Sequence, residues 1–417
     1  MDEIAKGKRP RIAVVGAGFG GVKVAQIFKN EAVDVTVVDR NNFHLFQPLL
    51  YQVSTAVLSV NEIAYPIRAF FRRQKNAEFY YGEVVDFKLD EKKLVTDKGE
   101  VSYDYLVLAA GATTNFFGLK TVEKHALPMK TLEESVAIRN HVLEMFEAAS
   151  KESDPEKRKQ LLTFVCVGGG PTGVEEAGAL SELIYHVLVK EYHQLDFSEV
   201  DIKLVEAVDS LLLMMPQSLR DETARVLRRK KVDVRLNTQV LDYDGEKLTF
   251  KSGEVVPTKT VIWAAGVRAV PVTEKLGVEC DRSGRVVVNE FLQVPGHPEV
   301  FAIGDMAHFV QDGAPLGTIA PVAMQEAEVC VKNILHLLRG QPLERFYYTD
   351  VGSMATIGRA EAVMCKGSMK SSGFIAWSAW MFVHLIRLAG VHANIIVTLK
   401  WIWNFFSGLR LGRIIVK

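Results

Sequence analysis

The sequence predicts an α/β protein with two Rossmann-like domains and a C-terminal segment of amphipathic helices. One observation is a glycine fingerprint that occurs twice, as Gly16-Ala-Gly18-Phe-Gly-Gly21 and as Gly168-Gly-Gly170-Pro-Thr-Gly173. Each copy follows an apolar, β-rich run and opens a segment of small residues that is typical of a helix. A second observation is the apolar, tryptophan-containing and basic segment after Lys366. Because 417 residues exceed one ordinary core, we expect two domains and an appendage.

The first fingerprint predicts a site for the pyrophosphate of a dinucleotide. Its first glycine makes a tight turn, the second lets the backbone approach the phosphates, and the third packs helix against strand. The next strand, residues 33–38, ends at Asp39, where a carboxylate can accept hydrogen bonds from an adenosine ribose. The alternative is that Asp39 only ends a strand. Two fingerprints in this context imply two dinucleotides, usually because electrons pass from one to the other.

The second fingerprint predicts a nicotinamide dinucleotide. The strand 202–205 ends at Glu206, and its distance from Gly168 exceeds the usual gap of about 20 residues. An enlarged helix plus a loop over residues 181–200 explains the excess, and the alternative is that Glu206 only ends a strand. No arginine follows Glu206, so a 2′-phosphate would meet negative charge, and we expect NADH rather than NADPH.

Matching strand endings form an internal repeat. Residues 105–111 and residues 260–266 both end in Ala-Ala-Gly, where small residues let the backbone pass close to a ligand. The segment 300–305 is again a strand followed by Gly-Asp, which we interpret as the return of the chain to the first domain. The predicted domains are 8–117 and 291–369 for the first, discontinuous domain, 118–290 for the second, and 370–417 for the C-terminal helices. The charged connector 149–160 predicts an exposed loop or frayed helix.

Composition excludes several function classes. Lys+Arg and Asp+Glu both number 50, so no overall charge points to nucleic acid. Four isolated cysteines argue against a disulfide framework, a structural zinc site and a dithiol centre, and with no HxH or HExxH pattern we expect no metal. The N-terminus lacks an apolar signal segment, which predicts a cytosolic compartment. No run of 18 uninterrupted apolar residues exists, so we expect no transmembrane helix.

The segment from Lys366 to Lys417 predicts helices that lie on a membrane surface. It contains seven basic residues, no Asp or Glu, and four of the five tryptophans. Apolar residues recur at helical spacing from Trp377 to Leu388 and from Ile395 to Phe406, with a break expected at Gly390 and Asn394. Basic, tryptophan-bearing helices suit an interface with anionic lipids. The alternative is a pair of helices packed on the core or on a second subunit.

With these features the chain resembles the type II NADH dehydrogenases, the single-subunit, non-pumping NADH:quinone oxidoreductases. The resemblance runs nearly end to end and is carried by residues 44–52, 168–175, 204–207, 261–267, 302–305, 373–377 and 384–385. It implies FAD in the first domain, NADH in the second, and two-step, ping-pong transfer of electrons to a quinone, either menaquinone or ubiquinone. It also implies a peripheral position on the cytoplasmic side of the cell membrane, and a homodimer is a further expectation.

The resemblance and the fingerprints together give the expected contacts. Those for FAD are Gly16, Gly18, Phe19, Gly20, Gly21, Asp39, Arg40, Gln47, Ala110, Gly111, Gly304 and Asp305. Those for NADH are Gly168, Gly170, Pro171, Thr172, Gly173, Glu175, Glu206, Ala265 and Gly266. Those for quinone are Ala323, Met324 and Gln325.

Two side chains are the expected catalytic residues, Glu175 and Gln325. A carboxyl buried beside a flavin would have a raised pKa and could relay protons; the alternative for Glu175 is an acid that stabilises the start of a helix. The family's quinone signature is Ala-Gln-x-x-x-Gln, but here Pro321 replaces the first glutamine, so the expected quinone site lacks that polar side chain. His44, Gln47 and Tyr51 line either the flavin or the quinone entry, or they form an ordinary packed loop.

Rival functions remain on the same scaffold. A sulfide:quinone oxidoreductase needs cysteines close to the flavin, whereas Cys166 lies inside a strand that should be buried. Another NAD(P)H-dependent flavoprotein reductase would use a soluble carrier and would not explain the basic tail. A membrane-tethered flavoprotein that binds nucleotide to recruit partners, with little turnover, is a candidate from a different class.

Overall fold

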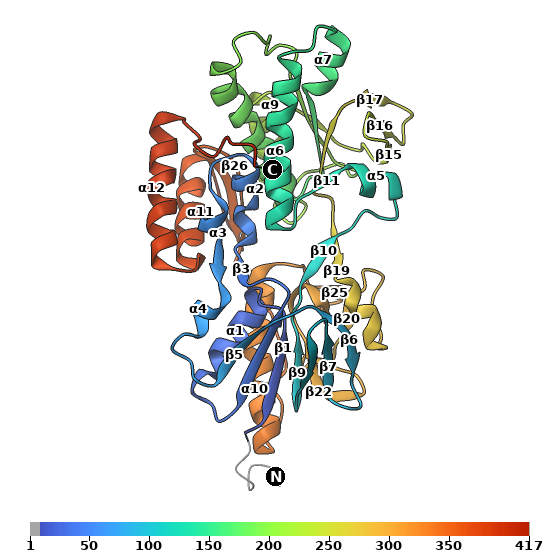
Figure 1. Ribbon diagram of the computed structural model, residues 1–417, viewed down its shortest axis with the longest axis vertical. Helices are drawn as coiled ribbons and strands as arrows, with labels where there is room; N and C mark the ends of the chain where they lie inside the picture. Colours follow the sequence, from blue (N-terminus) through green and yellow to red (C-terminus); the bar gives the residue numbers. More distant parts are fainter. Residues whose placement is uncertain (1–8, 417) are drawn as a thin grey trace. The chain divides into compact units, whose positions relative to one another are not determined.

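The computed structural model describes residues 9–416 (Figure 1). The N-terminal segment that lacks an apolar signal, the first residue of the predicted domain 8–117, and Lys417 therefore lie outside the described residues. The chain divides into two compact units, which are described one at a time. The prediction of an α/β fold with two Rossmann-like sheets is confirmed.

The first unit holds the sheet that carries the first fingerprint. It comprises residues up to Leu45, Ala64–Thr113 and Val267–Asp350. Its main sheet has the order β21-β22-β9-β1-β2-β5, with β1 parallel to both β2 and β9 (Figure 1). The predicted return of the chain to this unit is thus present, because β22 pairs in parallel with β9.

Alternation along β1 sends side chains to two different cores. Ile12 and Val14 join the core under α1 and α10, whereas Ala13 and Val15 join the core under the β6-β7-β8 meander. Successive strand residues point to opposite faces, so an apolar run without alternation requires cover on both sides. The result is a three-layer unit with the fingerprint at the carboxyl end of its central strand.

The elements of the first unit have the following bounds. The strands are β1 (Arg11–Val15), β2 (Asp34–Asp39), β3 (Phe43–Leu45), β4 (Ala64–Pro66), β5 (Ala77–Tyr81), β6 (Val84–Lys88), β7 (Lys93–Thr96), β8 (Gly99–Ser102), β9 (Tyr105–Leu108), β10 (Ala112–Thr114), β19 (Val267–Ala269), β20 (Val286–Val287), β21 (Gln293–Val294), β22 (His297–Ala302), β23 (Ala307–His308), β24 (Val310–Gln311) and β25 (Ala314–Pro315). The helices are α1 (Phe19–Ile27), α4 (Ile67–Phe71) and α10 (Ala320–Arg339), with 3-10 turns at Phe28–Asn30, Pro271–Leu276 and Gly304–Met306.

The second unit repeats the plan around the second fingerprint. It comprises Phe46–Ile63, Thr114–Gly266 and the chain from Val351 onward. Its main sheet has the order β11-β18-β12-β13-β14, and a second antiparallel meander, β15-β16-β17, covers one face. On β12 the residues Val165 and Val167 face that meander, while Phe164 stacks on Phe146 of α6 with ring centroids 5.8 Å apart.

The elements of the second unit have the following bounds. The strands are β11 (Leu127–Pro128), β12 (Thr163–Val167), β13 (Asp201–Val205), β14 (Val232–Arg235), β15 (Val240–Tyr243), β16 (Lys247–Phe250), β17 (Val255–Pro257), β18 (Thr260–Trp263), β26 (Ser353–Gly358), β27 (Glu361–Lys366) and β28 (Met369–Ser372). The helices are α2 (Leu50–Ser54), α3 (Val60–Ile63), α5 (Lys120–His125), α6 (Leu132–Ala149), α7 (Pro155–Leu161), α8 (Pro171–Glu182), α9 (Gln217–Arg229), α11 (Gly373–Arg387) and α12 (Val391–Ser407). A π-helical turn at Leu183–Val187 continues α8, and 3-10 turns span Gln47–Leu49 and Leu188–Lys190.

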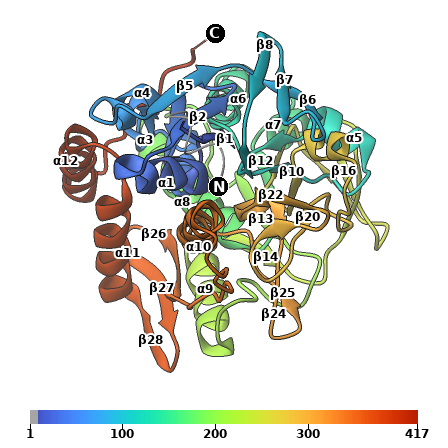
Figure 2. The same cartoon turned by 90° about the horizontal axis from the view of Figure 1, so that it is seen from below.

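The C-terminal helices belong to the second unit. A meander of β26, β27 and β28 leads into α11, which packs on β27 and beside α12 (Figure 2). Gly390, with φ 92°, separates the two helices as predicted, whereas Asn394 lies inside α12 and not at the break. Among the helices of residues 9–416, none combines the length and the apolar character needed to span a membrane.

The chain passes between the two compact units at residues that differ from the predicted domain boundaries. Residues 46–63 and 351–369 belong to the second unit, and residues 267–290 belong to the first. The reason is packing at long range: β26 lies against α8, and α2 packs on both α6 and α8. The connector 149–160 is also more ordered than predicted, because Asp154 caps α7 by accepting from the backbone of Glu156 at 3.0 Å.

Candidate functional site

The first glycine fingerprint, residues 16–21, folds into a turn between β1 and α1 that we call the first elbow; the second elbow is the corresponding turn at residues 168–173. The first elbow has the geometry that pyrophosphate binding requires. Gly16 has φ 101°, and a Cβ there would lie 2.4 Å from the carbonyl oxygen of Ala109. A Cβ on Gly21 would lie 1.9 Å from the carbonyl oxygen of Gly16, so this glycine permits the close contact of α1 with the strand. A Cβ on Gly18 would meet no protein atom within 4 Å. The open side of Gly18, at the start of α1, is therefore where a phosphate can approach backbone N–H groups.

Asp39 ends β2 and ties the elbow to it. Its Oδ2 accepts from the backbone N–H of Ala17 at 2.6 Å and its Oδ1 from that of Asn41 at 2.7 Å. Burial raises the pKa of Asp39, and the two backbone donors act against that rise. Each carboxylate oxygen keeps a second lone pair, so the side chain can still accept from ribose hydroxyls.

The return segment brings Asp305 to the same unit. Gly304 has φ 66°, and its N–H donates to Oε2 of Glu326 on α10 at 2.5 Å. Burial raises the pKa of Glu326 to about 8, with the Gly304 N–H opposing and the charge of Asp305 adding to the rise. Sequence reasoning missed Glu326, because only the fold brings α10 under the Gly-Asp turn.

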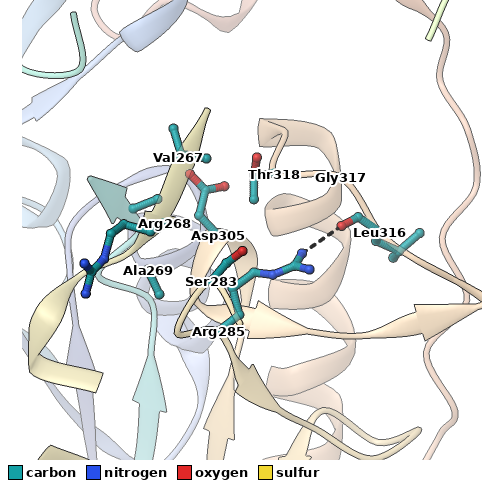
Figure 3. Close-up of a pocket in the computed structure, with 10 residues that line it drawn as sticks. Val267, Arg268, Ala269, Ser283, Arg285, Asp305, Leu316, Gly317 and Thr318 are labelled. Atoms are coloured by element: carbon teal, nitrogen blue, oxygen red, sulfur yellow. Dashed lines mark hydrogen bonds between the residues drawn. The ribbon is translucent and has the colours of Figure 1, made fainter. Parts of the chain in front are cut away.

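Asp305 lines a cavity of about 220 Å³ in the first unit (Figure 3). Opposite it stands Arg285, whose Nη1 donates to the carbonyl oxygen of Leu316 at 3.2 Å and whose Nε donates to Asp281 at 2.8 Å. The other lining residues come from β10, β19, and the loops before β20 and α10: Ala112, Val267, Arg268, Ala269, Ser283, Gly317 and Thr318. A carboxylate and fixed cations around one cavity suit a polar ligand.

The other residues predicted for FAD are divided between the units. Ala110 donates its N–H to Sδ of Met306 at 2.9 Å, and Gly111 has φ 75° with open space beside it. The Phe19 ring, on the first turn of α1, meets the His44 ring edge to face at 5.1 Å. Arg40 pairs with Glu83 on the surface.

Gln47 is predicted to contact FAD together with residues of the first domain, but it does not belong to the first unit. It belongs to the second unit, where its Oε1 lies 3.4 Å from Nζ of Lys130. His44, three residues earlier, belongs to the first unit because the chain passes from one unit to the other after Leu45.

The second elbow is a near copy of the first. Gly168 has φ 116° and would clash with Ala264 if it carried a Cβ, and a Cβ on Gly173 would again lie 1.9 Å from the carbonyl oxygen of the first glycine. Gly170 faces open space, as Gly18 does. Pro171 occupies the first turn of α8, where its missing N–H has no helical partner to lose. This repetition agrees with the interpretation of the fingerprint as two equivalent phosphate sites.

Glu206 occupies the position that Asp39 has in the first unit. Its Oε2 accepts from the backbone N–H of Gly169 at 2.5 Å and its Oε1 from that of Val208 at 3.1 Å. Both acids therefore hold the turn before the helix as well as end their strands. Beside this elbow, Gly266 has φ 88° and its carbonyl oxygen accepts from the N–H of Asn115 at 3.2 Å.

Glu175 is a buried carboxyl on the first turns of α8. Its Oε1 accepts from the backbone N–H of Thr356 at 3.2 Å. Burial raises its pKa to about 8, and the hydrogen bonds from Thr356 act in the opposite direction. A carboxyl held near neutral pH by desolvation is the type of group that proton relay requires.

A chain of buried polar groups leads away from Glu175. The Thr356 hydroxyl lies 3.0 Å from the hydroxyl of Tyr51, which accepts from Nε2 of Gln52 at 2.9 Å. Oε1 of Gln52 in turn accepts from Nε1 of Trp401, on α12, at 2.7 Å. Of the residues in this chain, sequence reasoning named Glu175 and Tyr51 but did not connect them.

Gln325 lies on α10 and has its side-chain amide engaged. Its Oε1 accepts from the N–H of Thr349 at 3.0 Å and its Nε2 donates to the carbonyl oxygen of the same residue at 2.9 Å. Pro321, which replaces the family's first glutamine, occupies the first turn of the helix. Ala323 is buried against Gly304, and Met324 is partly buried.

Two of the four cysteines, Cys166 and Cys330, are buried in positions that give no support to sulfur chemistry. Cys166 is buried within β12, and burial raises its pKa well above the usual range. Cys330 is buried in α10. A thiol must be ionised and accessible to act as a nucleophile.

Comparisons with known proteins agree on one family. A family model described as pyridine nucleotide-disulphide oxidoreductase matches residues 10–327. Two Mycobacterium tuberculosis proteins, the type II NADH:quinone oxidoreductases Ndh and NdhA, are 37% and 38% identical to this chain, and each alignment covers 97% of this chain and 89% of the relative. The type II NADH:quinone oxidoreductase of Staphylococcus aureus is 30% identical over 85% of this chain and 89% of its own length.

Similar solved structures identify the fold but do not distinguish between the possible reactions. NDH2 from Plasmodium falciparum in complex with NADH has a TM-score of 0.89 at 21% identity, covering 98% of this chain and 100% of that one. The sulfide:quinone oxidoreductase of Aquifex aeolicus has a TM-score of 0.72 at 17% identity, covering 96% of each chain. Because both rival activities occur on this fold, the sequence relatives decide between them.

Proposed function

The chain belongs to the type II NADH:quinone oxidoreductases, flavoproteins of the pyridine nucleotide-disulphide oxidoreductase family, and we propose that its first elbow holds FAD and its second holds NADH. The observation that carries this assignment is the pair of matching elbows. In each, the middle glycine faces open space and an acid at the end of the next strand is bonded to the turn. FAD, when bound, supplies the carrier that accepts two electrons from NADH and passes them to quinone.

In the first unit, the residues fit FAD. The N–H groups at the start of α1 would bind the pyrophosphate, and Asp39 would accept from the adenosine ribose. Asp305, on the rim of the cavity with Arg285, would accept from the ribityl hydroxyls. Ala110 and Gly111 would let the backbone pass close to the ring system, and Arg40 would lie at the adenosine end.

In the second unit, the residues fit NADH. The turn Gly168–Gly173, with Thr172 exposed at its edge, would bind the pyrophosphate. Glu206 would bind the ribose hydroxyls and repel the 2′-phosphate of NADPH. Ala265 and Gly266 would let the nicotinamide end lie against the backbone.

Glu175 is the proton-holding group in this proposal. Its neutral form prevails below about pH 8 because burial disfavours the carboxylate. Thr356 orients one carboxyl oxygen of Glu175 through its backbone N–H. Glu175 can therefore hold a proton close to the nicotinamide site and release it at neutral to mildly alkaline pH.

Gln325 is the proposed quinone contact, with Ala323 and Met324 beside it. The two hydrogen bonds to Thr349 fix the plane of the Gln325 amide, and its second N–H stays available to donate to a quinone carbonyl. Pro321 offers no polar group where the family has its first glutamine, so the quinone site of this chain has fewer donors.

The proposed location is the cytoplasmic side of the cell membrane, with α11 and α12 as the peripheral contact. Ile395, Leu399, Ile402 and Phe406 form an exposed apolar stripe on α12. Apolar side chains on helices without acidic residues suit insertion among lipid head groups. A homodimer stays a prediction.

An absorption spectrum tests the assignment. The purified protein should show the flavin bands, NADH should bleach them, and a water-soluble quinone should restore them. NADPH at equal concentration should bleach the bands far more slowly. A colourless protein that takes up no FAD on reconstitution would refute the assignment of both elbows, and bleaching by sulfide but not by NADH would refute the donor.

A further inference from the structure

The second unit has a basic groove that the reaction leaves unused. It has a volume of about 230 Å³ and lies between the π-helical turn Leu183–Val187, the end of α9 and the β26–β27 turn. Its lining residues are Ser181, Tyr185, His186, Arg229, Lys230, Lys231, Arg359 and Glu361. Four of these carry a permanent positive charge and one carries a negative charge, so the groove is cationic.

Two of the cations are held by the framework of the groove. Nζ of Lys230 lies 2.6 Å from Oε1 of Glu182, and Arg229 pairs with Glu361. Glu182 also accepts from the backbone N–H of Arg359 at 2.6 Å and from Nη2 of Arg410 at 3.2 Å. These bonds fix the three elements around the groove to one another.

The other two cations stand over aromatic rings and have no carboxylate. Nζ of Lys231 lies 4.5 Å from the centre of the Tyr185 ring, and the Arg359 guanidinium lies 4.7 Å from that of Phe405. Within residues 9–416 neither of them forms an ion pair. A ring face orients a cation but leaves its N–H donors free. Both side chains can therefore donate to an anion in the groove.

Lys231 occupies a backbone position that favours glycine. It has φ 62° and directly follows the last residues of α9, where a left-handed residue ends the helix. A lysine there is less favourable than glycine by about 1 kcal/mol. Interaction with the helix dipole does not explain the presence of a lysine at position 231, because Arg228 and Arg229 already lie in the last turn of α9.

The groove adjoins the apolar surface of α12. Phe405, under Arg359, lies 5.4 Å from the Trp377 ring of α11, centroid to centroid. The next residue, Phe406, is 81% exposed and belongs to the apolar stripe. Aromatic side chains in contact with cations are typical of the zone where lipid head groups lie.

We propose that this groove binds the phosphate of an anionic phospholipid head group, with Lys231 and Arg359 as its donors and the α12 stripe among the acyl chains. This inference rests on the proposed peripheral contact and adds a specific site to it. A lipid is favoured over a free phosphate because Arg359 of the groove lies over Phe405, whose neighbour Phe406 belongs to the exposed apolar stripe.

Vesicle binding of the FAD-loaded, full-length protein tests the proposal. The double variant Lys231→Gln/Arg359→Gln should bind phosphatidylglycerol-containing vesicles about 10- to 30-fold more weakly than wild type, since each cation near such a surface contributes about 1 kcal/mol. The matched control Lys98→Gln/Arg345→Gln removes the same charge from the first unit, and its Lys98 also lies over an aromatic ring. The control should bind within twofold of wild type.

Hydrogen exchange identifies the ligand. Backbone N–H groups of residues 229–231 and 358–361 should exchange more slowly with phosphatidylglycerol vesicles than with phosphatidylcholine vesicles or inorganic phosphate. Equal slowing by inorganic phosphate would overturn the lipid assignment, and so would equal vesicle binding by the two double variants. If wild type does not bind vesicles while NADH still bleaches the flavin, both the proposed membrane contact and this lipid site are refuted. The assignment of the two elbows to FAD and NADH is then unaffected.

Discussion

The pKa of Glu175 gives the sharpest prediction for the reaction. Burial raises it from 4.5 to about 8, which corresponds to about 5 kcal/mol in favour of the neutral carboxyl. Roughly one carboxyl in ten is then ionised at pH 7 and nine in ten at pH 9. If the neutral carboxyl supplies a proton during quinone reduction, that half-reaction should slow about tenfold for each pH step above 8.

The variant Glu175→Gln removes this titration and nearly preserves shape. Stopped-flow reoxidation of the NADH-reduced protein by a water-soluble quinone, from pH 6 to 10, should show a break near 8 in wild type and none in the variant. The free energy of unfolding provides a second readout. In wild type the raised pKa of Glu175 contributes stability that is fully present below pH 4.5 and is lost as pH rises to about 8. The free energy of unfolding of Glu175→Gln relative to that of wild type should therefore increase between pH 4.5 and pH 8.

A neighbouring carboxyl supplies the control. Glu176 is also buried with its pKa raised to about 8, but its Oε2 accepts from the Ser54 hydroxyl at 2.6 Å. Glu176→Gln should leave the kinetic break near 8 in place. A break that persists in Glu175→Gln, or one that disappears in Glu176→Gln instead, would refute the assignment of the proton to Glu175.

Three further predictions concern the elbows and the buried ion pair. Gly21→Ala should prevent folding of the first elbow, whereas Gly18→Ala should leave the melting temperature within a few degrees but weaken FAD binding, measured by fluorescence titration. Glu206→Gln should raise kcat/KM for NADPH relative to NADH at least severalfold, and an unchanged ratio would contradict its role. Arg410→Ala leaves Glu182 with one cation fewer in a buried site, and should lower the free energy of unfolding by about 3–5 kcal/mol in denaturant titrations.

The sequence was sufficient for features that depend on short stretches of chain. Glycine sterics and apolar runs within some tens of residues predict the bounds of β1, the two elbows, Asp39 at the end of β2 and Glu206 directly after β13. The equivalence of Asp39 and Glu206 extends further than predicted, because each also accepts an N–H from its own turn. Local backbone requirements leave few residue types that fit, so a pattern can reveal them.

Long-range contacts could not be predicted in this way. The segment 46–63 joins the second unit although it follows the first fingerprint, because α2 packs on α6 and α8. Thr356 donates a hydrogen bond to Glu175 although the two residues lie far apart in the sequence, and no periodic pattern predicts that contact. The basic groove likewise combines three elements that lie far apart in the sequence.

Three buried glutamates show how such contacts set chemistry. Glu175, Glu176 and Glu326 all have pKa values raised to about 8, and burial is the largest cause in each case. Each accepts from a neutral donor, Thr356, Ser54 or Gly304, and within residues 9–416 none of the three forms a direct ion pair. The charges of Arg410 near Glu176 and of Arg285 near Glu326 act to lower the pKa but do not outweigh burial. Glu182 is also buried but has Lys230 and Arg410 beside it, and its pKa is lowered although burial acts to raise it. The same side chain is therefore a proton store or a permanent anion depending on whether a cation shares its site, and only the first kind can serve a reaction that delivers protons to quinone.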